Sequence, residues 1–176
     1  MTNITKRITL DAMLLALLCI IGMFSIPLGD NIKVSLQFLG VIIIFGIVQK
    51  FIDKLLIVSL YLLIGLFLPV YAGFSAGVTP TFGFVIGFVI SAPIFHLIYL
   101  IKFPYDNLKF YFAATISLLV TYISGSIFLA WFLNMEYLPS LMISVVPYIP
   151  FDIIKIVIGG YITKRINQIK PKQLYN

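Results

Sequence analysis

The sequence is poor in the residues that build metal and catalytic sites. Its 176 residues include one cysteine, Cys19, and one histidine, His96. A single thiol excludes a disulfide framework and a cysteine-rich metal site. A single histidine excludes a His-Glu-x-x-His motif, and neither a Walker A motif nor a Ser/His/Asp set can be recognised. We therefore predict no enzyme activity, no metal and no cofactor, and we interpret His96 as a packed or interfacial side chain.

Charged residues are also scarce, at 10% of the chain, whereas 61% of the residues are hydrophobic. Soluble domains carry about 25% charged residues, so an ordinary globular protein is excluded. The net charge of +6 does not indicate a nucleic-acid partner, because the basic residues stand in short clusters between apolar runs. The composition predicts an integral protein of the cell membrane that is surrounded by lipid.

Six apolar stretches approach the length of about 20 residues that a membrane-spanning helix needs. The first contains Asp11 and is longer than the apolar part of a signal peptide, so we interpret it as a retained helix. The second is short, which predicts tilt or a mismatch with the bilayer. The connections are short as well, and we predict one domain, residues 1–176. The predicted spans are 8–26, 34–48, 55–71, 81–101, 110–133 and 141–162.

The positions of the basic residues predict the orientation, because cytoplasmic loops carry an excess of Lys and Arg. The side that faces away from the cytoplasm has Lys33, beside Asp30, and a loop with Glu136. Lys155 lies inside the last span. Both termini are therefore expected in the cytoplasm. The basic residues on that side are Lys6, Arg7, Lys50, Lys54, Lys102, Lys109, Lys164, Arg165, Lys170 and Lys172.

Two outer connections, residues 26–33 and 71–80, are rich in Gly, Pro and small polar residues. Such segments can fold over the mouth of a cavity as lids, since glycine adopts dihedral angles that other residues avoid. Ordinary turn formation explains the same composition equally well. Both interpretations stay open at this point.

The strongest local signal is an acidic and a basic residue inside the last span, Asp152 and Lys155. They are three residues apart and share one helical face, and each costs several kcal/mol at the bilayer centre. Asp152 lies roughly 18 Å outward of Lys164 at about 1.5 Å per residue, which predicts a site in the outer half. We favour a polar ligand site over a structural ion pair. Tyr148 extends the same face, and Pro147 and Pro150 should loosen the helix.

Milder polar residues occur in other spans. Gln37 opens the second span and Tyr61 lies in the third. Thr121, Ser124 and Gly125 form a stripe of small residues that is more typical of helix packing than of ligand contact. Ala12 and Ala16 are four residues apart on the first span and form a flat strip that allows another helix to approach closely. The spacing does not decide whether that helix belongs to this chain or to a partner.

Four stretches carry motifs that occur together in one transporter family. They are Ala12–Ala16 as an Ala-x-x-x-Ala strip, Ile32-Lys-Val-Ser-Leu-Gln37-Phe-Leu-Gly40, the run Tyr61-x-x-x-Gly65-x-x-x-Pro69-Val-Tyr71-Ala-Gly73, and the acidic and basic pair in Tyr148–Lys155. Over roughly residues 7–165, the chain resembles the BioY family, the biotin-specific substrate-binding (S) components of energy-coupling factor (ECF) transporters. One departure is the stretch Pro80-Thr81-Phe82-Gly83-Phe84, where the family has Pro-Thr-Gly-Gly-Tyr.

The resemblance implies an all-α bundle of six transmembrane helices that captures biotin from outside. It implies a transmembrane coupling subunit and two cytoplasmic ATPase subunits as partners, with Ala12 and Ala16 at the interface with the coupling subunit. Asp152 is expected to accept hydrogen bonds from the ureido N–H groups of biotin, and Lys155 to orient it or to meet a ligand oxygen. Further substrate-binding residues implied by the resemblance are Gln37, Tyr61, Tyr71, Thr81, Phe84 and Tyr148.

Three alternatives remain at this point. The same architecture serves other vitamins, such as riboflavin, thiamine or a pantothenate-like acid. A structural membrane subunit that binds no ligand would use Asp152 and Lys155 only to hold helices together. A membrane enzyme is the weakest alternative, because no nucleophile and base are available.

Overall fold

The computed structural model describes residues 3–27, 33–102 and 106–169. Lys170, Lys172 and Asp30, which entered the orientation argument, lie outside these residues. Helices form most of the described chain, and one short antiparallel ribbon pairs Ser25 with Ser35. The elements are α1 (Asn3–Met23), β1 (Ser25–Pro27), β2 (Lys33–Ser35), α2 (Gln37–Ile47), α3 (Phe51–Phe67), α4 (Phe82–Leu100), α5 (Asp106–Leu133), α6 (Tyr137–Ser144), the 3₁₀ helix η1 (Val146–Tyr148) and α7 (Ile149–Ile169).

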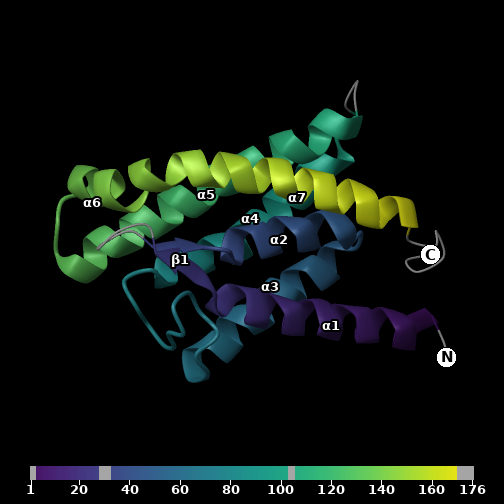
Figure 1. Cartoon of the computed structure of the whole chain (residues 1–176), viewed down its shortest axis with the longest axis horizontal. Helices are drawn as coiled ribbons and strands as arrows, with labels where there is room; N and C mark the ends of the chain where they lie inside the picture. The colour runs from purple at the N-terminus through teal and green to yellow at the C-terminus, as the bar shows by residue number, and fades with distance from the viewer. Residues whose placement is uncertain (1–2, 28–32, 103–105, 170–176) are drawn as a thin grey trace.

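The helices lie lengthwise, with the start of α1 and the end of α7 at the same end of the bundle (Figure 1). The ribbon and α6 lie at the opposite end. The start of α1 and the end of α7 therefore fall on the side where the basic residues cluster, which the distribution of Lys and Arg assigns to the cytoplasm. We refer to this side as the cytoplasmic end and to the other as the outer end.

Three helical segments of the described chain are long and apolar enough to cross a membrane: Phe82–Leu100, Leu108–Leu133 and Tyr137–Ile169. Helix α2 is apolar but has only 11 residues, about 16 Å at 1.5 Å per residue. It is shorter than the predicted span 34–48 because its outer part is strand β2. Helix α1 likewise ends at Met23, where the chain turns into β1, and α3 ends at Phe67.

The last predicted span is broken into α6, η1 and α7. Pro147 lies in the first turn of η1, and Pro150 in the first turn of α7. Proline has no N–H to donate and clashes with the preceding turn, and two prolines three residues apart favour a break in the helix here. As a result, a new helix begins at Ile149, three residues before Asp152.

Small residues allow α4 and α5 to pack in close contact. A Cβ atom at Gly83 would overlap Phe128, and one at Gly87 would overlap the backbone of Thr121. The Ser124 hydroxyl donates a hydrogen bond to the carbonyl oxygen of Gly83, at 2.9 Å. The stripe that includes Thr121 and Ser124 is therefore a helix-packing surface, as predicted.

Helix α7 packs against α2 in a parallel register that two glycines define. Gly159 leaves room for Ile42, and one turn further Gly46 leaves room for Thr163. The same register, extended toward the outer end, brings Lys155 level with the first turn of α2. The residues of α7 on its other side are large, apolar and exposed, which fits a surface covered by lipid: Ile153, Ile154, Val157, Ile158 and Tyr161.

Two charged residues at the start of α3 are buried at the cytoplasmic end, although Lys54 was interpreted from the sequence only as an orientation signal. Asp53 forms an ion pair with Arg7 of α1, with 3.3 Å between Nε and Oδ2. The Lys54 side chain is 2% exposed, and its ammonium group lies over the rings of Phe95 and Tyr99, at 5.1 and 5.3 Å. These charges therefore also join α3 to α1 and α4.

Candidate functional site

Asp152 and Lys155 form a buried ion pair in the first two turns of α7. Their side-chain atoms Oδ1 and Nζ are 2.6 Å apart, and the two residues are 5% and 7% exposed. The predicted contact between them is present. Helix α7 directs both charged side chains into the bundle, whereas its neighbouring isoleucines Ile153 and Ile154 face outward.

A tyrosine that the sequence did not single out completes this group. The Tyr122 hydroxyl of α5 donates a hydrogen bond to the second carboxylate oxygen of Asp152, at 2.5 Å. The carboxylate thus receives one donor on each oxygen. A carboxylate accepts about four hydrogen bonds in total, so Asp152 keeps capacity for further donors. We call Asp152, Lys155 and Tyr122 the acidic cluster.

A second polar group lies at the outer ends of α2 and α3. The Gln37 amide nitrogen donates to the Tyr61 hydroxyl at 2.6 Å, and Tyr61 in turn donates to the carbonyl oxygen of Val70 at 3.0 Å. The Ser35 hydroxyl donates to the Gln37 amide oxygen at 3.1 Å. The predicted residues Gln37 and Tyr61 are thus joined directly, and Tyr61 is fully buried.

Tyr71 stands beside this second group. Its ring meets that of Tyr61 edge-on, with centroids 5.6 Å apart, and its hydroxyl donates to the carbonyl oxygen of Leu62 at 2.6 Å. The ring occupies the space where Gly65 would carry a Cβ atom. Gly65 and Tyr71, six positions apart in the sequence motif, are therefore complementary in shape, and Phe82 extends the aromatic surface at 6.2 Å from Tyr71.

Backbone hydrogen bonds hold the connection that follows Tyr71 against the outer ends of α1 and α3. Gly73 N–H donates to the carbonyl oxygen of Met23, and Gly77 N–H donates to that of Gly65. Both glycines have positive φ, +73° and +78°, a conformation that glycine adopts without steric cost. The segment is therefore a shaped turn. Its opening as a lid remains one of the two interpretations made from the sequence.

The other predicted ligand residues are dispersed around these groups. Thr81 precedes α4, is exposed, and has its hydroxyl 3.1 Å from that of Thr79. Phe84 packs where Gly125 of α5 lacks a side chain. Tyr148 ends η1 and is half-buried. The hydrogen bonds described above join Gln37 to Tyr61 and Asp152 to Lys155, and Thr81, Phe84 and Tyr148 belong to neither group.

The small-residue strip of α1 faces away from the bundle. Ala12 and Ala16 are exposed, whereas Leu14 and Leu18 of the same helix are buried against the core. Around the strip, large apolar residues are exposed as well, among them Met13 at 65%. This helix face is unoccupied by the described part of the chain.

Comparison with known proteins decides the family. The model of the BioY family matches residues 1–172. The chain belongs to the BioY family. Among its relatives, the biotin transporter BioY of Rhodobacter capsulatus is 30% identical, with 96% of this chain and 97% of that protein covered. The biotin transporter BioY of Thermotoga maritima is 27% identical, with 90% and 94% covered.

A solved structure agrees with this assignment. The crystal structure of the S component for biotin from an ECF-type ABC transporter matches with a TM-score of 0.84 and 25% identity. The match covers 99% of this chain and 98% of that one. The predicted family and fold class, a six-helix membrane bundle of the ECF S-component type, are therefore confirmed. This BioY protein is a multi-pass membrane transport protein and not an enzyme.

Proposed function

We propose that this BioY protein captures biotin at the outer end of the bundle and passes it inward as the S component of an ECF transporter. The observation that carries the proposal is the buried acidic cluster. Burying a carboxylate and an ammonium group costs several kcal/mol each before pairing, and an intramembrane ion pair is a functional-site hypothesis by default. The names of the relatives support biotin as the ligand.

The chemistry of biotin suits the acidic cluster. The ureido ring has two N–H donors, and Asp152 has acceptor capacity beyond its bonds to Lys155 and Tyr122. Hydrogen bonds from N–H groups to a carboxylate are charge-assisted and roughly twice as strong as neutral ones. Lys155 and Tyr122 hold the carboxylate in one orientation, so little freedom is lost when the ligand binds.

The second polar group and its aromatic neighbours would bind the remainder of the ligand. The hydroxyls of Tyr61 and Tyr71 already donate to backbone carbonyls, so these residues contribute ring surface rather than free donors. Gln37 fixes the Tyr61 ring through its amide. In this arrangement Thr81, Phe84 and Tyr148 are proposed as the rim around the ligand.

Release of the ligand inward is proposed to depend on partners. The exposed Ala12 and Ala16 leave a flat surface on α1 that allows close approach of a helix, and we assign it to a transmembrane coupling subunit. Two cytoplasmic ATPases would supply the energy, since the chain has no nucleotide-binding motif of its own. Deletion of the coupling subunit should abolish uptake and leave binding intact.

The test is a binding isotherm for labelled biotin on the purified protein, with riboflavin, thiamine and pantothenate as competitors. The Asp152→Asn variant should bind biotin at least tenfold more weakly, whereas Glu136→Gln, the same chemical change at an exposed outer position, should bind like the parent. Competition by another vitamin at lower concentration than biotin would assign a different ligand. Unchanged affinity in Asp152→Asn would refute the site and leave the pair a structural one.

A further inference from the structure

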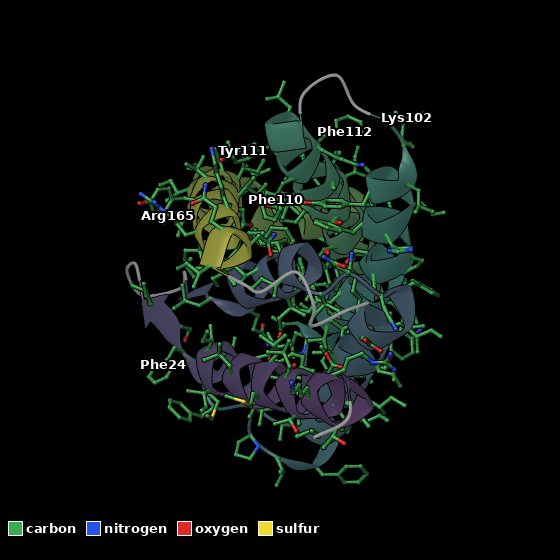
Figure 2. The ribbon with its side chains drawn as sticks, turned by 90° about the vertical axis from the view of Figure 1, so that its right-hand side faces the viewer. Phe24, Lys102, Phe110, Tyr111, Phe112 and Arg165 are labelled. Carbon is green, nitrogen blue, oxygen red and sulfur yellow. The ribbon has the colours of Figure 1, made fainter. Side chains whose placement is uncertain are left out.

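A cavity lies at the cytoplasmic end, far from the acidic cluster along α7. It has a volume of about 490 Å³ and lies between the end of α4, the start of α5 and the end of α7. Small-molecule sites fall in the range of about 300–1,000 Å³. Figure 2 looks onto this end, with Phe110 and Tyr111 toward α7 and Arg165 on the outer side of α7. The lining residues are Tyr99, Phe110, Tyr111, Gly160, Thr163, Lys164, Asn167 and Gln168.

One lining residue has an unsatisfied polar group. Thr163 is 4% exposed, and its hydroxyl has no hydrogen-bond partner among the described residues. Threonines within helices commonly donate to the carbonyl one turn back, as Thr121 does to Ser117. The hydroxyl oxygen is inaccessible and packs against Gly46 of α2, so Thr163 contributes only other atoms to the cavity wall and its hydroxyl is not a ligand contact.

The cations around the cavity indicate the charge of that ligand. Lys164 is part of the wall, and the Lys109 ammonium group lies 5.4 Å from the centre of the Tyr99 ring. Arg165 follows Lys164, is exposed, and donates from Nε to the Tyr161 hydroxyl at 3.3 Å. None of the lining residues that the structure describes is acidic. A basic and aromatic cavity of this composition favours an anion that also carries an apolar part.

The position of the cavity relative to the membrane indicates where the anion comes from. Lys164 and Arg165 mark the cytoplasmic boundary of the membrane, because basic residues gather there. The wall also includes the aromatic rings of Tyr99, Phe110 and Tyr111, which provide apolar surface for the upper part of a lipid. Basic pockets between transmembrane helices on the cytoplasmic side bind phospholipid headgroups.

We propose that this cavity binds the headgroup of an anionic phospholipid from the cytoplasmic leaflet. The phosphate accepts from Lys164, with Lys109 beside Tyr99 as a second cation, and the glycerol and upper acyl carbons lie on Phe110 and Tyr111. The lipid then bridges α5 and α7 at the end opposite to the acidic cluster. This site is independent of the ligand that the outer end takes.

The test is native mass spectrometry of the purified protein after incubation with phosphatidylglycerol or phosphatidylcholine. We expect phosphatidylglycerol to be retained at least fivefold more than phosphatidylcholine in the parent. Lys164→Gln should reduce that preference several-fold, and Lys109→Gln, which removes the cation beside Tyr99, should reduce it as well. The control is Lys50→Gln, which removes one exposed positive charge at the same end but outside the cavity, and it should retain the preference.

Two outcomes would overturn the proposal. Equal loss in Lys50→Gln and Lys164→Gln would mean that only the net charge of the surface attracts the lipid. Displacement of phosphatidylglycerol by millimolar inorganic phosphate would mean that the cavity takes a free anion and not a lipid. Monodispersity and thermal unfolding of each variant establish that it is folded, and Lys109→Gln still decides the question if Lys164→Gln does not fold.

Discussion

The first prediction concerns the acidic cluster, where the negative charge of Asp152 is balanced by the positive charge of Lys155 inside the bundle. Removing one of the two charges leaves the other without compensation. Replacing Lys155 with Met removes the charge, shortens the side chain by one atom, and leaves the Asp152 carboxylate with Tyr122 as its described partner. Breaking a buried ion pair by removing one partner costs about 3–5 kcal/mol. For a chain of 150–250 residues, each kcal/mol lowers the melting temperature by about 2–4 °C. We therefore expect Lys155→Met to unfold at least about 6 °C below the parent.

The double variant Asp152→Asn/Lys155→Met separates stability from binding. It carries no charge at positions 152 and 155, so most of the lost stability should return, because replacing both partners of a buried pair is often neutral. Its affinity for biotin should stay low, since a hydrogen bond to a charged group contributes about 1.5–3 kcal/mol. At about 1.4 kcal/mol per factor of ten, this corresponds to a loss of roughly 10- to 150-fold.

Both quantities can be measured on the same detergent-purified samples, by thermal unfolding and by a biotin isotherm. A double variant that unfolds as early as Lys155→Met would show that the uncompensated charge is not the cause of the instability. A double variant that binds biotin like the parent would refute Asp152 as the acceptor for the ligand. The first result would contradict the explanation of the lost stability, and the second would contradict the explanation of binding.

Two further predictions concern the rest of the bundle. Gly65→Ala places a methyl group in the space of the Tyr71 ring and should cost about 1–3 kcal/mol by overpacking; unchanged thermal unfolding would contradict this. Arg7→Gln leaves the Asp53 carboxylate, which is 4% exposed, without its cation and should cost about 1–3 kcal/mol. Lys6→Gln, the neighbouring exposed position, should leave the melting temperature unchanged, and equal effects of the two variants would refute the role of the ion pair.

The sequence by itself determined the class of protein and one half of the candidate site. Apolar stretches of spanning length, the distribution of basic residues and the pair Asp152 and Lys155 all depend on local spacing along the chain. Helical geometry places residues three apart on one face, so the ion pair could be predicted without any tertiary contact. The small-residue stripe at Thr121 could be assigned to helix packing for the same reason.

Only the tertiary structure decided which residues from different helices meet. Tyr122 lies 30 positions before Asp152, and nothing in the spacing of α5 marks it as a partner of α7. Lys54 looked like a surface charge because sequence cannot show that Phe95 and Tyr99 cover it. The ribbon of β1 and β2 was missed because its two strands have three residues each, too short for an alternating pattern. Contacts between distant segments depend on how helices cross and rotate, and a single sequence does not encode this in any local pattern.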